Sequence, residues 1–177
     1  KEKCEENPNE FYKFYACGGD GTVNEVVNGL IDYPNAAFTV YPCGSGNDFV
    51  KASKNYDFTD INALINGEQM EIDLIKANGK YSVNIVNAGF DAATAHRMVK
   101  FKRWPLVSGK MAYNLAIVVS LMREMKHKGK VYVDDELVYD GNFLLTAACN
   151  GICCGGSFYF APNAEIDNGL IELMLIK

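Results

Sequence analysis

Two glycine-rich segments of the chain carry residues that could bind phosphate. The first is Gly18-Gly19-Asp20-Gly21-Thr22. Glycines let the backbone approach a ligand closely, and the N–H groups of a turn at the start of a helix converge on an anion. Asp20 would repel a bare phosphate, so it is better suited to hold Mg²⁺ or its waters, which bridge nucleotide phosphates. The alternative is a tight turn in which Asp20 and Thr22 only cap a helix.

The second segment, Gly44-Ser45-Gly46-Asn47-Asp48, follows Pro42 and Cys43 and repeats this chemistry. Two glycine-rich loops that each contain an acid are harder to explain as coincidence than one. A third acid, Asp73, lies in an apolar stretch, where a carboxylate is unfavourable unless it is paired, hydrogen-bonded or near a metal. For Asp73 alone, a half-exposed strand residue is an equal alternative. The two loops together predict a site for nucleotide phosphates.

The apolar pattern around the loops indicates how they are positioned. An apolar run at 11–17 ends at the first loop, and a second run at 37–41 ends just before Pro42, so each is expected to be a buried strand. Apolar residues from Val23 to Leu30 recur at spacings of three and four, which predicts a helix with one buried face. This order places both loops at the carboxyl ends of parallel strands, where α/β sheets bind ligands.

The pattern changes after about residue 68. Short runs of alternating polarity follow one another, at 70–76, 80–86, 130–133, 137–139, 143–148 and 170–176. Such runs predict a β-rich, largely antiparallel region. Helical spacing at 92–100 and 110–125 predicts two helices inserted among the strands. We therefore expect an α/β domain over 1–68 and a β-rich domain over 69–177.

Composition excludes some classes of function. The 177 residues carry a net charge of -5, which gives no bulk attraction to nucleic acid. The six cysteines form no C-x-x-C pair and only two histidines accompany them, so we expect reduced core thiols and a cytoplasmic protein. No apolar run reaches the roughly 20 residues that span a bilayer, so contact with the inner membrane face would be peripheral.

One basic cluster suits an anionic bilayer surface because large apolar residues interrupt it. Its members are Arg97, Lys100, Lys102, Arg103 and Trp104. The alternative is a solvated helix face followed by a loop. His96 and His127 have no visible partners and are expected to be structural.

Four stretches of the chain resemble the catalytic domain shared by bacterial diacylglycerol kinases, sphingosine kinases and ceramide kinases. They are GGDGTVNEVVNGL at 18–30, PCGSGNDF at 42–49, NAGFD at 87–91, and NGICCGGS followed by APNAEIDNG within 150–169. The resemblance implies an amino-terminal α/β nucleotide-binding domain similar to that of NAD kinase. A mainly antiparallel β-sandwich domain with inserted helices would follow it.

The resemblance also implies an activity, which is transfer of the γ-phosphate of ATP to a lipid alcohol, with diacylglycerol as the default acceptor. It implies that the loops Gly18–Thr22 and Gly44–Asn47 line the nucleotide phosphates. Asp20, Asp48 and Asp73 fall where family members place acids that organise Mg²⁺ and its waters.

The chain departs from the family pattern in three places. It starts beyond the first strand and glycine loop of the family, and it ends before the Asp-Gly-Glu whose Asp acts as base, so we expect a trimmed chain. Asp134-Asp135-Glu136 looks similar but falls at a predicted hairpin and is not expected to be the base. Asp167-Asn168-Gly169 resembles a turn that binds a structural Mg²⁺ in some relatives. The resemblance implies that Asp167 is a ligand of this ion. Asn168 weakens that site because an amide binds a hard cation less well than a carboxylate.

Other functions stay open at the level of sequence. NAD kinase shares the first glycine turn but has a different second loop, and a phosphofructokinase-like sugar kinase needs a longer α/β domain. A nucleotide-binding regulatory module without transfer activity would bind ATP without turnover. A purely structural interaction domain would require both glycine loops to be accidental.

Overall fold

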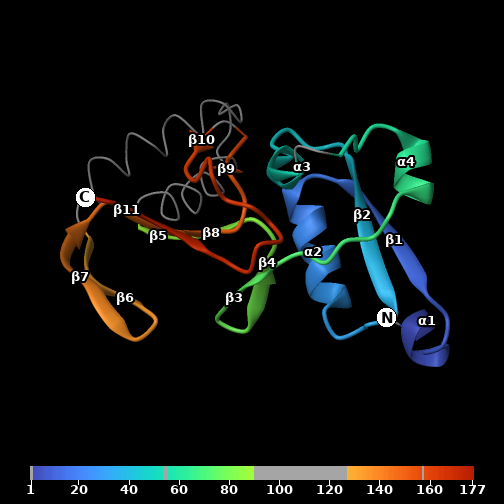
Figure 1. Ribbon diagram of the computed structural model, residues 1–177, viewed down its shortest axis with the longest axis horizontal. Helices are drawn as coiled ribbons and strands as arrows, with labels where there is room; N and C mark the ends of the chain where they lie inside the picture. The colour runs from blue at the N-terminus through green and yellow to red at the C-terminus, as the bar shows by residue number, and fades with distance from the viewer. Residues whose placement is uncertain (1, 54–55, 90–126, 157) are drawn as a thin grey trace, which may run out of the picture. The chain divides into compact units, whose positions relative to one another are not determined.

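The computed structural model describes residues 2–53, 56–89, 127–156 and 158–177, and the chain divides into two compact units (Figure 1). The first unit comprises Lys1–Val86 and Cys149–Glu172, and the second comprises Asn87–Ala148 and Leu173–Lys177. The domain boundary predicted after residue 68 stays a prediction, and it falls inside the first of these units. The helices predicted at 92–100 and 110–125 lie outside the described residues.

The first unit contains most of the elements that surround the glycine-rich loops. Along the chain these are α1 (Glu2–Glu6), β1 (Tyr12–Gly18), α2 (Asp20–Leu30), β2 (Ala36–Pro42), α3 (Asp48–Ala52), α4 (Ile61–Asn66), β3 (Ile75–Ala77), β4 (Lys80–Ser82), β9 (Cys153–Cys154) and β10 (Phe158–Tyr159). A three-stranded sheet of order β11-β8-β5 is formed by β5 (Ile85–Gly89), β8 (Leu145–Cys149) and β11 (Glu172–Ile176). The second unit also contains the hairpin of β6 (His127–Val133) and β7 (Glu136–Phe143).

The β1–α2–β2 segment forms the parallel arrangement that its apolar pattern predicts. β1 and β2 pair in parallel from Tyr12↔Ala36 to Gly18↔Pro42, so both strands end at the same edge. The inward-facing Ala16 and Val40 are only 2% and 1% exposed. α2 begins at Asp20 with Gly19 as its N-cap residue, and Thr22 therefore lies within the helix. The capping role that the alternative interpretation gave to Thr22 was wrong, because the helix begins directly after the strand.

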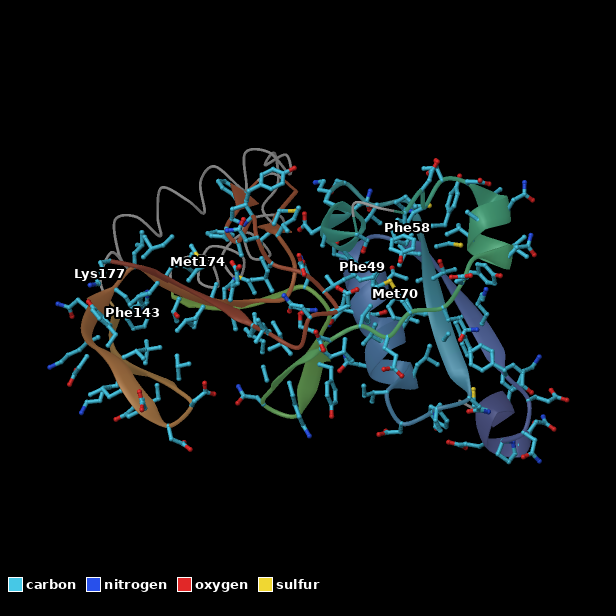
Figure 2. The ribbon with its side chains drawn as sticks, in the orientation of Figure 1. Phe49, Phe58, Met70, Phe143, Met174 and Lys177 are labelled. Atoms are coloured by element: carbon cyan, nitrogen blue, oxygen red, sulfur yellow. The ribbon has the colours of Figure 1, made fainter. Side chains whose placement is uncertain are left out.

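The core of the first unit joins residues that are far apart in the sequence. Its buried members are Ala16, Val23, Val27, Val40, Phe49, Val83 and Ile166. Phe49 of α3 packs with its ring centroid 5.8 Å from that of Phe38 and 6.1 Å from that of Phe58. Figure 2 shows Phe49 and Phe58 close together in this unit. Packing of Val83 and Ile166 into this cluster secures the later segments against the α/β layer.

Two asparagines fix the chain between residues 73 and 84. The Asn28 side chain of α2 donates to the Tyr81 carbonyl at 2.7 Å and accepts from the Tyr81 N–H at 2.8 Å. Asn150 is fully buried, and its Nδ2 donates to the carbonyls of Asp73 at 2.8 Å and Val83 at 3.0 Å. Buried polar groups of this kind are retained because each bond satisfies a main-chain group that has left water. The segment after β8 is thereby brought against the α/β layer.

The prediction of a largely antiparallel second half is confirmed for three hairpins. β3 with β4, β6 with β7, and β9 with β10 all pair antiparallel. The β6–β7 turn consists of Asp134 and Asp135, both left-handed at φ 49° and 66°, as a two-residue hairpin loop requires. The strand predicted at 70–76 is reduced to β3, because the Asp73 N–H donates to the Ile166 carbonyl instead of joining a ladder.

No helix within the described parts of the chain is long and apolar enough to cross a membrane. The basic cluster Arg97, Lys100, Lys102, Arg103 and Trp104, and also His96, lie outside the described residues.

Candidate functional site

The two glycine-rich loops meet at the carboxyl ends of β1 and β2. The Cys43 N–H donates to the Gly18 carbonyl at 3.0 Å, directly beyond the last strand pair. The loops then touch main chain to main chain, since a Cβ built on Gly44 would lie only 2.5 Å from the Gly19 Cα. Only glycine permits this approach. The sequence prediction that both loops share one edge of a parallel sheet is confirmed.

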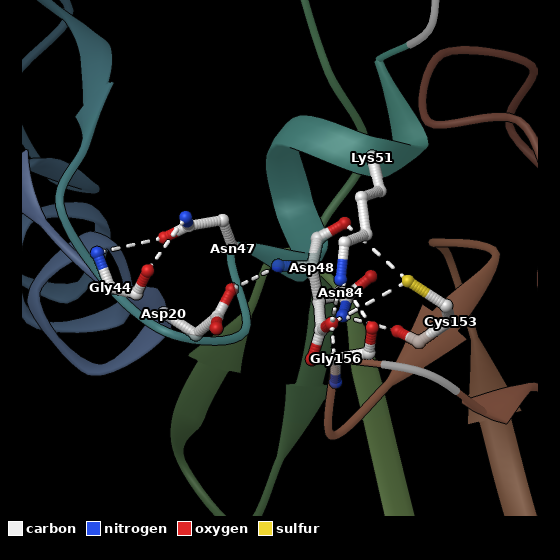
Figure 3. Close-up of polar contacts among 8 residues, drawn as sticks. All are labelled: Asp20, Gly44, Asn47, Asp48, Lys51, Asn84, Cys153 and Gly156. Atoms are coloured by element: carbon white, nitrogen blue, oxygen red, sulfur yellow. Dashed lines mark hydrogen bonds and ion pairs between the residues drawn. The ribbon is translucent and has the colours of Figure 1, made fainter.

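Asp20 links the two loops through its side chain. Its Oδ1 accepts a hydrogen bond from the Asp48 N–H at 2.6 Å (Figure 3). Asp20 is the first residue of α2, and Asp48 is the first residue of α3. A carboxylate is favoured at both places by the positive end of the helix dipole. The acid of the first loop therefore sets the position of the second loop.

The second loop is closed by a reciprocal pair of hydrogen bonds. The Gly44 N–H donates to Asn47 Oδ1 at 3.0 Å, and Asn47 Nδ2 donates to the Gly44 carbonyl at 2.9 Å. Asn47 takes a left-handed conformation at φ 52° and directs the chain into α3. The Gly44 N–H is thus engaged within the loop, whereas in the described residues the N–H groups of Ser45 and Gly46 have no recorded partner.

Asp48 is buried, with 5% of its surface exposed. Its Oδ1 accepts a hydrogen bond from the Gly156 N–H at 2.9 Å and lies 3.7 Å from Lys51 Nζ. Sequence reasoning gave no role to Lys51 or Gly156. The signal that could have indicated Gly156 is its place in the NGICCGGS stretch, which the resemblance includes.

The Oδ2 atoms of Asp20 and Asp48 both lie near Gly46 in the second loop. A Cβ built on Gly46 would lie 2.7 Å from Asp20 Oδ2 and 3.7 Å from Asp48 Oδ2. A pocket of about 400 Å³ opens beside them within the first unit, lined by both acids, Asn24 and residues of the 77–86 segment. The two acids that begin α2 and α3 therefore both line one cavity.

Asp73 and Asp167 lie at a different place in the first unit. Asp73 is half-buried, and its Oδ2 accepts from the Gly169 N–H at 2.6 Å. Asp167 is exposed, and the turn after it is closed by Asn168 Oδ1, which accepts from the Leu170 N–H at 2.9 Å. Among the described residues, the structure brings Asp20 and Asp48 together and records no contact of Asp73 or Asp167 with either. The roles of Asp73 and Asp167 stay predictions.

Comparison with known protein families matches nearly the whole chain. Residues 2–77 match the "Diacylglycerol kinase catalytic domain", and residues 84–177 match the "YegS C-terminal NAD kinase beta sandwich-like domain". The chain belongs to the diacylglycerol kinase catalytic domain family. The predicted fold class, an α/β domain followed by a β-sandwich domain, is confirmed by the same two matches.

Individual relatives match most of the chain. The chain is 34% identical over 167 residues to a Shewanella frigidimarina protein named "Probable lipid kinase YegS-like", and 30% identical over 172 residues to a Bacillus subtilis protein named "Diacylglycerol kinase". These matches cover 90% and 95% of the chain, which spans about half of each relative, 53% and 56%. A crystal structure of a diacylglycerol kinase from Bacillus anthracis superposes with a TM-score of 0.67 at 25% identity, over 99% of this chain and 57% of that one.

The relatives of this chain are named as kinases, and kinases bind ATP together with Mg²⁺. Within the described residues no three acids, histidines or cysteines gather as a metal-binding group. The available donors are Asp20 Oδ2 and Asp48 Oδ2, which both lie near Gly46. Mg²⁺ fits such a pair, because it commonly takes one or two carboxylates and fills its other positions with waters and substrate phosphates. The donor set suits a metal that arrives with a nucleotide.

The six cysteines of this family member are all free, as predicted, but two of them are not core residues. Cys17 and Cys43 are exposed, because Ala16 and Val40 take the inward positions of β1 and β2 and the loop begins at Cys43. Burial raises the pKa of both the Cys149 and Cys153 thiols to about 11, and for Cys153 the neighbouring Asp48 carboxylate adds to the effect. These two thiols are therefore neutral at pH 8.

Alkylation with iodoacetamide at pH 8 is expected to modify Cys17 and Cys43 first and to leave Cys149 and Cys153 unmodified in the native protein. The thiolate is the reacting form, and a raised pKa lowers its fraction at pH 8 while burial blocks access. Peptide mass spectrometry at several times would give the order. Labelling in urea, where every cysteine is accessible, provides the reference rate. Equal native rates for Cys43 and Cys153 would contradict the buried position of Cys153.

Proposed function

We propose that the full-length protein is an ATP-dependent lipid kinase that transfers the γ-phosphate to the hydroxyl of a lipid alcohol. Diacylglycerol is the acceptor we propose first, which makes phosphatidic acid the product. The hydrogen bond from the Asp48 N–H to Asp20 Oδ1 carries the proposal, because it joins two glycine-rich loops and two acids at one sheet edge. Membership of the diacylglycerol kinase family and the names of the relatives support it.

Phosphoryl transfer depends on positioning and charge stabilisation more than on covalent chemistry. The N–H groups at the start of α2, which have no partner within a helix, would donate to the phosphate oxygens of ATP. Those of Ser45 and Gly46 would do the same from the second loop. The close approach of Gly19 and Gly44 keeps side chains out of the space that the phosphates need.

Asp20 and Asp48 would hold Mg²⁺ through the oxygens that face Gly46. When bound, the ion would stabilise the negative charge on the phosphate that is transferred. Asp20 has a second task, since its other oxygen keeps the Asp48 main chain in place. Asp73 and Asp167 are further candidate acids: Asp167 belongs to the turn at 167–169, and Asp73 Oδ2 accepts a hydrogen bond from the Gly169 N–H of that turn.

A general base must also remove the proton of the acceptor hydroxyl. We do not propose Asp134 for this role, because it lies exposed in the β6–β7 turn of the second unit. The basic cluster around Trp104 is the surface that we propose for peripheral membrane contact at the inner face, on its sequence alone.

The test uses full-length protein, γ-labelled ATP and Mg²⁺. Diacylglycerol, ceramide and sphingosine are offered separately in mixed micelles, and NAD is offered in solution. We expect label in phosphatidic acid and none in NADP, with thin-layer chromatography as the measurement. Label in NADP alone would replace the lipid kinase with an NAD kinase-like activity. ATP binding with no labelled acceptor would favour a regulatory nucleotide-binding module.

A further inference from the structure

A third glycine turn borders the second glycine-rich loop from more than a hundred residues later in the chain. Gly155 and Gly156 are both left-handed, at φ +64° and +83°, a conformation that side chains disfavour. A Cβ built on Gly156 would lie 3.4 Å from the Gly46 Cα and 3.7 Å from the Ser45 carbonyl oxygen. The turn therefore packs directly on the part of the loop whose N–H groups we propose to bind phosphate.

Lys51 is the side chain that holds this turn in place. Its Nζ donates to the Gly156 carbonyl and lies 3.7 Å from Asp48 Oδ1, while the Gly156 N–H donates to the same Oδ1 at 2.9 Å (Figure 3). The three groups form a closed ring of contacts between α3 and the Gly155–Gly156 turn. All of them belong to the first unit.

The charge balance of Asp48 explains why a cation is needed at this position. A carboxylate with 5% exposure has lost most of its water, and a buried charge is unfavourable unless a counter-charge and hydrogen bonds replace the water. Among the described residues, the recorded ion pair of Asp48 is the one with Lys51. The Cys153 thiol approaches the same Oδ1 at 3.5 Å but is neutral, because burial raises its pKa.

We propose that Lys51 is a positioning residue for phosphate binding. It fixes Asp48 through Oδ1, so that Oδ2 stays directed toward Gly46 and Asp20, and it clamps the Gly155–Gly156 turn onto the second glycine-rich loop. This proposal rests on the proposed function, since the phosphates that the loop would position are those of ATP. The proposed role of Lys51 does not require contact between its side chain and the substrate.

The test compares full-length Lys51→Met with Lys51→Arg. Removal of the ammonium group is expected to raise the KM for Mg·ATP and the Kd for a fluorescent ATP analogue by about tenfold, the effect of losing one charge-assisted hydrogen bond. The KM for diacylglycerol is expected to stay within about twofold, since the change acts on the nucleotide side. Lys51→Arg keeps a cation with several donors and is expected to recover most of the affinity.

Lys13 offers a matched control, because its Nζ also donates to a main-chain carbonyl, that of Ile65 at 2.9 Å, without an ion pair to any recorded carboxylate in the described residues. Lys13→Met is expected to show native kinetics and native nucleotide affinity. Thermal unfolding of all variants shows whether a change reflects lost fold.

Three results would overturn the proposal. They are native nucleotide affinity in Lys51→Met, failure of Lys51→Arg to recover it, and an equal rise in both KM values together with a lowered Tm, which indicates a structural role alone. Absence of lipid phosphorylation in the native protein would overturn the proposed function instead. Tenfold weaker binding of the ATP analogue in Lys51→Met would still support the role of Lys51.

Discussion

Replacing Asp20 by asparagine is expected to reduce phosphate transfer to lipid by about a hundredfold to a thousandfold, the usual effect of removing one charge-stabilising group from an active site. Asparagine keeps an oxygen that can accept the hydrogen bond from the Asp48 N–H, so the second loop should retain its position. What is lost is the negative charge at Oδ2, which we propose to hold Mg²⁺. The measurement is kcat/KM with labelled ATP at saturating diacylglycerol, over a range of Mg²⁺ concentrations.

Asp32→Asn is the control for this substitution, because Asp32 is exposed in the turn after α2 and lines neither loop. It is expected to leave transfer unchanged. Both variants should unfold at the temperature of the native protein within about 2 °C, since neither removes a buried contact. Full activity in Asp20→Asn would show that this acid stabilises the fold of the loops and does not take part in binding Mg²⁺ or phosphate.

Replacing Gly44 by alanine is expected to abolish nucleotide binding and to lower the free energy of unfolding by about 1–3 kcal/mol, the range for adding a methyl group where no space exists. The new Cβ would lie 2.5 Å from the Gly19 Cα and 2.8 Å from Asn47 Oδ1. Because one of these atoms is main chain, the two glycine-rich loops must separate. Urea denaturation and titration with a fluorescent ATP analogue measure the two effects.

Gly29→Ala is the matched control, since no atom lies within 4 Å of a Cβ built at this helical position. Alanine favours a helix over glycine by up to about 1 kcal/mol, so this variant should be slightly more stable and bind nucleotide normally. If Gly44→Ala bound the ATP analogue with native affinity, contact between the loops would be irrelevant to the site.

The arrangement of the two loops was predictable from the sequence because local patterns specify it. The apolar run of β1 ends at a glycine, that of β2 ends at Pro42 shortly before the second glycine-rich loop, and the helical spacing of Val23 to Leu30 lies between them. Parallel pairing then brings both loops to one edge without further information. The acids Asp20 and Asp48 were identified in the same way, from their places within the loops.

The contacts that complete the site were not predictable, because they join segments remote in sequence. The Asp48 carboxylate is paired with the Gly156 N–H, 108 positions later, and no local pattern indicates this partner. The short helices α3 and α4 also escaped prediction, since five and six residues cannot display a helical period. Asp73 was expected inside a strand, but its N–H and carboxylate bind the 166–169 turn instead.

The most direct test of the proposed site is a crystal structure of the full-length protein with a non-hydrolysable ATP analogue and Mn²⁺ in place of Mg²⁺. We expect the phosphates to accept hydrogen bonds from the N–H groups at the start of α2 and from Ser45 or Gly46. The anomalous signal of Mn²⁺ should lie beside the carboxylates of Asp20 and Asp48. A nucleotide bound away from both glycine-rich loops, or Mn²⁺ found only at the Asp167 turn, would contradict the account.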